Sequence, residues 1–158
     1  MNALRILEGD LNAANLRIAL VASRFNEAVV ERLVAGAVEA LAAQGADPEA
    51  LELVRVPGAF DLPPVVRRMA LSRRFDAIVV LGAVIRGDTP HFDYVAGECA
   101  AGLARIASET GVPVAFGVLT TDTEEQALDR AGGVEGNRGA DAARAAVELA
   151  NLMRMLER

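Results

Sequence analysis

The sequence lacks lysine altogether: the sixteen basic residues among its 158 are all arginine. A chain without lysine cannot carry a Schiff-base lysine, a pyridoxal-phosphate lysine or the lysine of a Walker A phosphate loop. Histidine and cysteine occur once each, as His91 and Cys99. A single histidine excludes a zinc site of the HExxH type, and a single cysteine excludes both a thiolate cluster and an internal disulfide.

Long apolar runs and an excess of positive charge are missing as well. No stretch approaches the roughly 20 apolar residues that span a bilayer, and residues 1–10 lack the pattern of a signal peptide. The formal net charge is −6, without the basic stripe that binds nucleic acid. We therefore expect a cytoplasmic protein that binds neither membranes nor nucleic acid, and the single cysteine fits a reducing compartment.

The chain does contain a regular alternation of two hydrophobic periods. Short apolar runs predict strands, and apolar residues at helical spacing between them predict helices. Strand and helix alternate four times, which indicates one domain, residues 1–158, with a four-stranded parallel sheet covered by helices on both faces. The predicted strands are 16–22, 51–56, 77–85 and 113–119. The first predicted helix follows residue 26, and the others are 64–71, 89–110, 123–130 and about 139 to the end.

Local signals predict where the first and third of these helices begin and where the first ends. Asn26 stands where it can cap the first helix, and Thr89 can cap the third with Pro90 in its first turn. Gly45 ends the first helix. Residues 4–7 have strand character but no hairpin partner nearby, so we predict that they pair with the sheet edge of a neighbouring subunit.

The loops after the predicted strands are the candidate site, because ligands of open parallel sheets bind beyond the carboxyl ends of the strands. Two of the six Phe and Tyr residues, Phe25 and Phe60, stand in these loops, together with the only histidine. A ring can stack on a flat heterocycle, and the Asp61 carboxylate can accept hydrogen bonds from sugar-like hydroxyls. Each residue has a structural alternative, because the rings could pack on the core and Asp88 or Thr89 could cap a helix. Their clustering favours a binding site.

Five motifs occur in order along nearly the whole chain. They are SRFN at 23–26, VPGAFDLP at 56–63, GAVIRGDTPHFDYV at 82–95, FGVLTTDTEEQALDRAG at 116–132 and GNRGADAA at 136–143. In these motifs and in their spacing the chain resembles the lumazine synthase family. The resemblance implies a flavodoxin-like three-layer α/β/α sandwich, with active sites between adjacent subunits of a pentamer.

The resemblance also implies an activity in riboflavin biosynthesis. The chain would be a transferase that condenses 5-amino-6-(D-ribitylamino)uracil with 3,4-dihydroxy-2-butanone 4-phosphate. The products would be 6,7-dimethyl-8-ribityllumazine, phosphate and water, in the penultimate step of the pathway. Both substrates are small molecules, no cofactor and no metal would be used, and riboflavin synthase becomes a candidate partner protein.

Carried over position by position, the resemblance implies roles for residues in each motif. His91 would carry protons, and Phe25 would stack on the pyrimidinedione. Phe116 and Arg130 would come from the adjacent subunit, with Phe116 on the pyrimidine and Arg130 on the phosphate. The other residues for the pyrimidine and ribityl groups would be Ala59, Phe60, Asp61, Ala83, Val84 and Ile85, and the other phosphate-binding residues Asp88, Thr89 and Arg138.

Two positions depart from the family pattern. Asp61 stands where the family usually has glutamate, so its carboxylate is one methylene shorter and has less reach. Val134 stands where the family has lysine, which places more weight on Arg130 and Arg138 for the phosphate.

The sequence bears on two other functions and on three assemblies. A receiver-type signalling module needs clustered acids after the first strand and a lysine, and this chain has neither. A catalytically inactive shell or carrier protein of the same fold stays open. For assembly, the resemblance implies a hollow icosahedral shell of sixty subunits, because in the family a short turn like that at 132–139 accompanies such closed shells. A free pentamer and a pair of pentamers are the alternatives.

Overall fold

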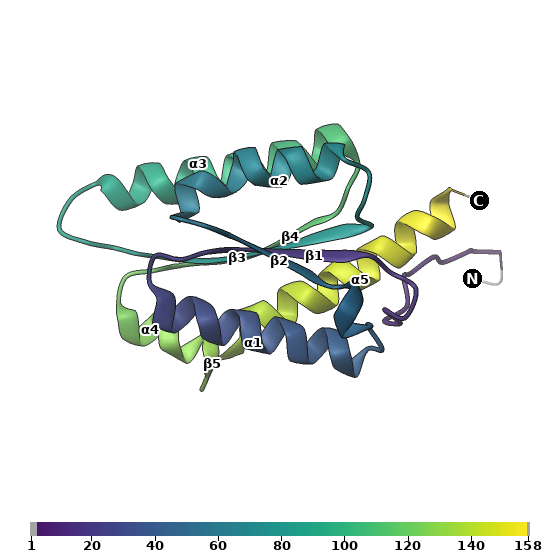
Figure 1. Cartoon of the computed structure of the whole chain (residues 1–158), viewed down its shortest axis with the longest axis horizontal. Helices are drawn as coiled ribbons and strands as arrows, with labels where there is room; N and C mark the ends of the chain where they lie inside the picture. The colour runs from purple at the N-terminus through teal and green to yellow at the C-terminus, as the bar shows by residue number, and fades with distance from the viewer. Residues whose placement is uncertain (1–2, 158) are drawn as a thin grey trace.

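The computed structural model describes residues 3–157, which form a parallel sheet between two layers of helices (Figure 1). The four strands lie in the order β2-β1-β3-β4, and each pair is parallel. The predicted α/β/α class with a four-stranded parallel sheet is therefore confirmed. The strands are β1 (Ile18–Ser23), β2 (Glu52–Val56), β3 (Ala77–Ile85) and β4 (Val114–Thr121).

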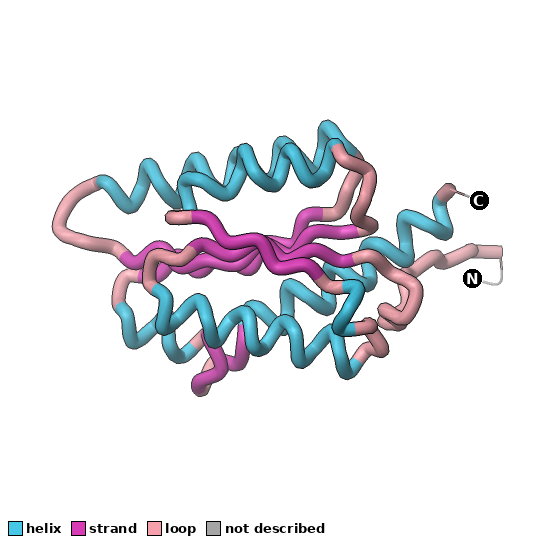
Figure 2. The backbone as a smooth tube through the Cα atoms, viewed as in Figure 1, coloured by secondary structure: helices cyan, strands magenta, loops and turns pink. Residues whose placement is uncertain are grey.

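The helices divide between the two faces of the sheet (Figure 2). α2 and α3 cover one face, and α1, α4 and α5 lie on the other. Every helix among residues 3–157 is too short or too polar to cross a bilayer. The helices are α1 (Glu27–Ala43), α2 (Leu62–Leu71), α3 (His91–Thr110), α4 (Glu124–Asp129) and α5 (Arg138–Leu156), with 3-10 turns η1 (Pro48–Ala50) and η2 (Ala59–Asp61).

β3 is the centre of the core. All of its residues except Ile85 are buried, as expected for an interior strand of a parallel sheet. Its side chains alternate between the two faces, since Val79 and Leu81 pack with residues of α1 and α5, whereas Ile78 and Val80 pack with residues of α2 and α3. The sheet thus separates two apolar clusters and presents only its edges and strand ends to solvent.

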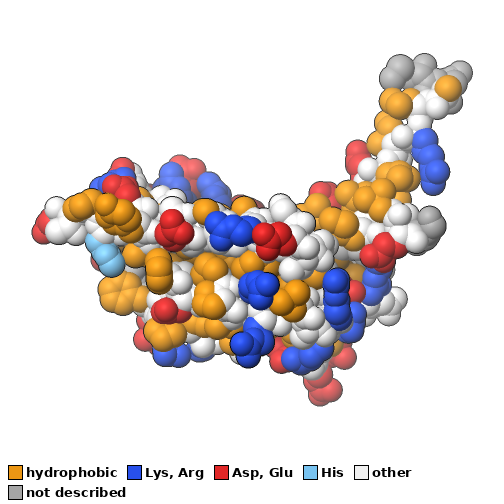
Figure 3. Space-filling model, turned by 90° about the horizontal axis from the view of Figure 1, so that it is seen from above, with side chains coloured by type: hydrophobic (Ala, Val, Ile, Leu, Met, Phe, Trp, Pro, Cys, Tyr) orange, Lys and Arg blue, Asp and Glu red, His pale blue; other side chains and the backbone are white. Residues whose placement is uncertain are grey.

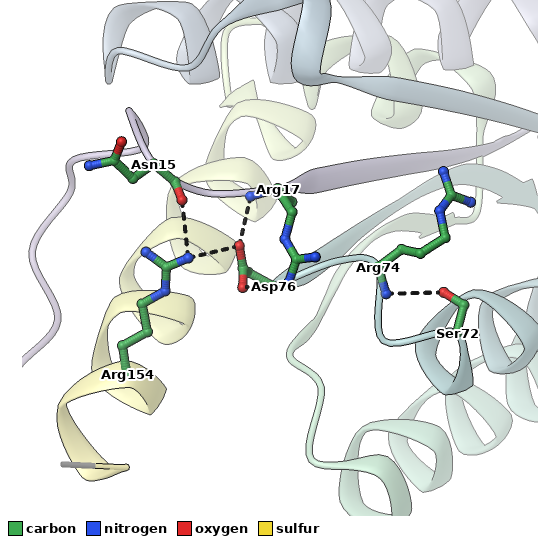
Figure 4. A network of polar contacts seen from close by, with 6 residues as sticks. All are labelled: Asn15, Arg17, Ser72, Arg74, Asp76 and Arg154. Carbon is green, nitrogen blue, oxygen red and sulfur yellow. Dashed lines mark hydrogen bonds and ion pairs between the residues drawn. The ribbon is translucent and has the colours of Figure 1, made fainter.

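The amino ends of the strands are held by one polar network (Figure 4). The Asp76 carboxylate, just before β3, accepts from the Arg17 backbone N–H at 2.7 Å and from the Arg154 guanidinium at 3.1 Å. Arg154 also donates to the Asn15 carbonyl at 3.0 Å. The Asp76 side chain is only 16% exposed, and its bonds join the chain that enters β1 and β3 to α5.

The N-terminal segment extends away from this body as an arm (Figure 3). Its base is tied to α5, because the Asn151 amide donates to the Asp10 carbonyl and to the Asn12 carbonyl, each at 3.0 Å. Beyond this base Leu4 and Ile6 are 58% and 69% exposed. The predicted strand at residues 4–7 does not form within the chain, and its pairing with a neighbouring subunit stays a prediction.

The two predicted side-chain caps, at α1 and α3, do not form. Asn26 does precede α1, but it has a left-handed backbone (φ 63°) and its side chain makes no capping bond. α3 begins at His91, with Pro90 rather than Thr89 at the cap position and no side-chain cap. The Thr89 hydroxyl reaches only the His91 N–H, at 3.5 Å. The Asn26 amide donates instead to the Ala83 carbonyl near the end of β3, at 2.9 Å.

The glycine-rich turn before α5 is a small hairpin that the sequence patterns did not predict. β5 (Ala131–Gly133) pairs antiparallel with β6 (Gly136–Asn137), and Gly132 and Gly136 have positive φ angles that favour glycine. Val134, at the turn, is 86% exposed. The Arg138 N–H donates to the Arg130 carbonyl at 2.8 Å, so the hairpin brings these two arginines side by side.

Candidate functional site

A pocket of about 670 Å³ opens beyond the carboxyl ends of β1, β2 and β3. This is where ligands of open parallel sheets bind. The walls come from three loops and from the first turns of α3, and four aromatic side chains take part. The lining residues are Phe25, Asn26, Pro57, Gly58, Ala59, Phe60, Asp61, Ala83, Val84, Ile85, Gly87, Thr89, His91, Phe92, Tyr94 and Val95.

The loop after β1 forms the first wall. It continues the β1–β2 ladder, because the Phe25 N–H donates to the Pro57 carbonyl at 3.0 Å. The Asn26 amide donates to the Ala83 carbonyl of β3 at 2.9 Å. With its backbone pinned on both sides, the Phe25 ring stands 72% exposed at the pocket. A large apolar ring held open to solvent is suited to stack on a planar ligand.

The second wall is the 3-10 turn η2 that follows β2. The Asp61 carboxylate accepts from the Gly58 N–H at 3.0 Å, closing the turn as a capping bond. Ala59 is buried under the turn, while Phe60 is 58% exposed. One oxygen of Asp61 is thereby used within the protein, and the other is left to accept a hydrogen bond from a ligand.

The third wall is the end of β3 with the start of α3. Val84 is buried and Ile85 half-buried at the strand end, and the exposed His91 opens the helix. Tyr94 lies one helical turn beyond His91, on the same face of α3, and is 69% exposed. An imidazole, a phenol and a carboxylate therefore border one largely apolar cavity, which is a setting for proton transfer to a bound heterocycle.

Comparison with known proteins agrees with this geometry. Residues 15–154 match the 6,7-dimethyl-8-ribityllumazine synthase family. The chain belongs to this family. It is 49% identical over 154 residues to the 6,7-dimethyl-8-ribityllumazine synthases of two Clostridium kluyveri strains, a similarity that covers 98% of this chain and all of each relative.

Most of the site residues predicted from the family motifs lie around the one pocket. They come from loops as far apart as residues 25 and 91, which the strand order brings together. Asp88 lies between two lining residues on the exposed loop after β3, without lining the pocket itself. The predicted residues on the pocket are Phe25, Ala59, Phe60, Asp61, Ala83, Val84, Ile85, Thr89 and His91.

Three further predicted residues, Phe116, Arg130 and Arg138, lie away from this pocket in the single chain. Phe116 is 47% exposed on the edge strand β4. Arg130 donates to the Gln126 carbonyl at 3.0 Å, next to the β5–β6 hairpin. Arg138 donates to the Asp141 carboxylate at 3.3 Å.

Five lining side chains were not among the predicted site residues: those of Asn26, Pro57, Phe92, Tyr94 and Val95. For Tyr94 and Val95 a signal was present, because both stand three or four residues after the histidine and so share its helix face. For Asn26 no local signal exists, since its partner carbonyl lies 57 residues away. Among residues 3–157, no group of three or more histidine, cysteine or acidic side chains is placed to hold a metal ion.

Proposed function

We propose that this chain condenses 5-amino-6-(D-ribitylamino)uracil with 3,4-dihydroxy-2-butanone 4-phosphate to give 6,7-dimethyl-8-ribityllumazine. The observation that carries the proposal is the convergence of Phe25, Asp61 and His91, which stand in three separate family motifs, on one pocket. An exposed ring, a hydrogen-bond acceptor and a proton carrier are what this condensation requires.

Phe25 and the end of β3 would hold the pyrimidinedione. Successive residues of a parallel strand direct their backbone groups to opposite sides. The Arg86 N–H is bonded on the β4 side, whereas the Ala83 carbonyl is bonded on the other side, toward the pocket. By this alternation the Ile85 backbone would face the pyrimidinedione ring, and Val84 would contribute its side chain rather than its backbone.

Asp61 would accept hydrogen bonds from the ribityl hydroxyls. Its carboxylate is already held by the Gly58 N–H, which fixes the direction of the remaining oxygen. Because Asp61 is shorter than the glutamate that is usual in the family, we assign it a single ribityl contact. Ala59 and Phe60, on the same turn, would border the ribityl chain.

His91 would move protons during the reaction. An amine of the pyrimidine attacks the ketone and an imine forms, phosphate leaves, and a second amine–carbonyl closure completes the ring. Each step transfers a proton, and an imidazole can donate and accept protons near neutral pH. Holding both substrates in one pocket would supply a further part of the rate.

The phosphate would lie at the start of α3 and meet arginines of a neighbouring subunit. Thr89 lines the pocket and Asp88 adjoins it, at a helix amino end where free N–H groups favour an anion. Arg130 and Arg138 of the neighbour would complete this site, because a guanidinium binds phosphate through two N–H groups at once. Phe116 of the neighbour would close over the pyrimidine.

The direct experiment is to mix the two substrates with the protein and to record the absorbance of the lumazine product. We expect formation well above the non-enzymatic rate, and a saturable dependence on both substrates. The matched control is Glu98→Gln, a change on the exposed face of α3 that should leave the rate unchanged. A protein that binds the pyrimidine but does not accelerate the reaction would instead be the inactive shell or carrier.

For assembly we propose a pentamer as the smallest active unit. The exposed Leu4 and Ile6 of the arm would cover a sheet edge of the next subunit, since an unpaired edge favours strand addition. The edge at β2 suits this best, because a hollow of about 370 Å³ lies beside it, lined in part by Val54, Val65 and Met69. As a larger assembly we favour a shell of sixty subunits, which could enclose riboflavin synthase. We place the protein in the cytoplasm.

Sedimentation separates these assemblies by mass. Five subunits of 16.6 kDa make about 83 kDa, and sixty make about 1 MDa. Leu4→Asp and Ile6→Asp, introduced together, should shift the protein to smaller species and lower the rate. A full rate from a species smaller than a pentamer would defeat the shared site, whereas an active pentamer would defeat only the shell.

A further inference from the structure

Arg86, the residue directly after β3, is held by three partners. Its Nε donates to Asp122 Oδ1 at 2.9 Å, and its Nη1 donates to Asp93 Oδ1 at 3.4 Å. Its guanidinium carbon lies 4.3 Å from the centre of the Phe92 ring, which is cation–π geometry. The Asp122 hydrogen bond raises the pKa of Arg86 above its ordinary value, so the guanidinium stays charged.

These contacts connect the ends of three elements. Phe92 and Asp93 belong to the first turn of α3, and Asp122 follows the last residue of β4. The Arg86 backbone N–H also donates to the Thr121 carbonyl at 2.8 Å. One residue thus ties the end of β3 both to the end of β4 and to the start of α3.

The connector between Arg86 and α3 has little else to hold it. Residues 87–90 are all exposed, and Gly87 has open space where a side chain would stand. α3 begins without a side-chain cap, and the contact from Thr89 to the His91 N–H is long, at 3.5 Å. Since Arg86 precedes this connector and contacts the residues that follow His91, its side chain closes the connector into a loop.

We propose that Arg86 is a positioning residue that orients His91 by clamping both ends of the connector at 87–91. The proposal rests on the proposed function in making His91 the proton carrier. Arg86 is not assigned to the phosphate, because its charge is already paired with the two carboxylates of Asp122 and Asp93 and one face of its guanidinium lies on Phe92. It also lies outside the lining of the pocket.

Arg74 provides a matched control within the same chain. It pairs with Glu52 and its guanidinium carbon lies 4.8 Å from the Phe75 ring centre, so it makes the same two kinds of contact. It stands at the amino end of β3, outside the lining of the pocket (Figure 4). Because Arg74 also lines the hollow beside β2, rates are compared only between variants that sediment like the wild type. Arg86→Gln and Arg74→Gln therefore remove similar contacts at opposite ends of one strand.

The test measures kcat and KM for these variants with and without His91→Ala. Arg86→Gln should lower kcat by roughly 10-fold or more, because a small displacement of a catalytic group is costly, and Arg74→Gln should stay within about 2-fold. In the His91→Ala background Arg86→Gln should cost less than about 2-fold, because it acts through the missing imidazole. Equal losses in both backgrounds, or a rise only in the KM of the phosphate substrate, would overturn the proposal.

Amide hydrogen exchange tests the positioning without using activity. Exchange at Asp93, whose N–H donates to the Pro90 carbonyl at 3.0 Å, and at His91, whose N–H contacts the Thr89 hydroxyl, should be about 10-fold faster in Arg86→Gln and unchanged in Arg74→Gln, because loss of the clamp increases local opening. Unchanged exchange in Arg86→Gln would overturn the proposal even for a fully active enzyme. A wild-type protein that makes no lumazine would defeat the proposed function, and the exchange result would still decide whether Arg86 holds the connector.

Discussion

The two ends of the parallel sheet carry similar kinds of residues and use them differently. At the amino end, the carboxylate of Asp76 accepts from Arg17 and Arg154 within a network that is closed on itself (Figure 4). At the carboxyl end, Phe25 and His91 stand exposed around an open pocket. Polar groups that satisfy one another stabilise the fold, whereas groups left facing a cavity are available to a ligand.

The direction of the strands explains this division. α1, η2 and α3 all follow a strand at its carboxyl end, so their amino ends surround the pocket. Such ends carry unpaired N–H groups that favour anions. At the opposite end the chain enters the strands, and side chains such as that of Asp76 satisfy the entering backbone. Changes at the two ends should therefore separate activity from stability.

The largest expected effect is that of His91→Ala. Loss of an acid–base group should lower kcat by roughly 10²–10⁴-fold, with the affinity for the pyrimidine largely kept, because the ring contacts come from the other walls. Steady-state kinetics at saturating substrate measure the change. An unchanged kcat would remove His91 from the mechanism.

Asp76→Ala should have the opposite profile. It leaves the Arg17 N–H and the Arg154 guanidinium without their shared acceptor, which should lower the free energy of unfolding by about 2 kcal/mol. The kcat of the assembled enzyme should stay near that of the wild type, because the network is at the far end of the sheet. Urea unfolding gives the first quantity, with exposed Glu98→Ala as the control; similar losses for both would show that the network contributes nothing.

At the pocket end, Arg130→Ala should lower the affinity for only one of the two substrates. It should weaken the butanone phosphate by about 10–100-fold, the value of a charge-assisted contact of 1.5–3 kcal/mol, and leave the affinity for the pyrimidine unchanged. Titration of each substrate alone measures the two affinities. If both fall together, Arg130 has a structural role near the β5–β6 hairpin instead.

The smallest effect is expected between the two ends, at Cys99 in the core. Burial raises the pKa of the Cys99 thiol to about 11, so between about pH 9 and 11 the folded state binds more protons than the unfolded one and stability falls as pH rises. At pH 8 the thiol is protonated in both states, so the effect is absent there and develops only as the pH approaches 11. The stability advantage of the wild type over Cys99→Ala should therefore shrink from pH 8 to pH 11. An advantage that stays constant would mean that burial in the folded state does not raise the pKa of the thiol.

The sequence by itself determined the elements and which loops carry chemistry. Hydrophobic period is a local property, so 77–85 was predicted with the bounds that β3 has, and the other strands within two residues. The rule that ligands bind beyond the carboxyl ends of parallel strands then selected the loops of Phe25, Phe60 and His91. These predictions needed only neighbours along the chain.

Only the tertiary structure decided how those loops meet. The order β2-β1-β3-β4 places the loops after β1, β2 and β3 around one pocket and leaves Phe116 on an edge strand. The same order lets Asn26 reach the Ala83 carbonyl, a distant acceptor that replaced the helix cap predicted from local pattern. Arg86 likewise finds Asp122, which is 36 residues away. Such contacts depend on which elements bury their faces together, and no local period encodes that choice.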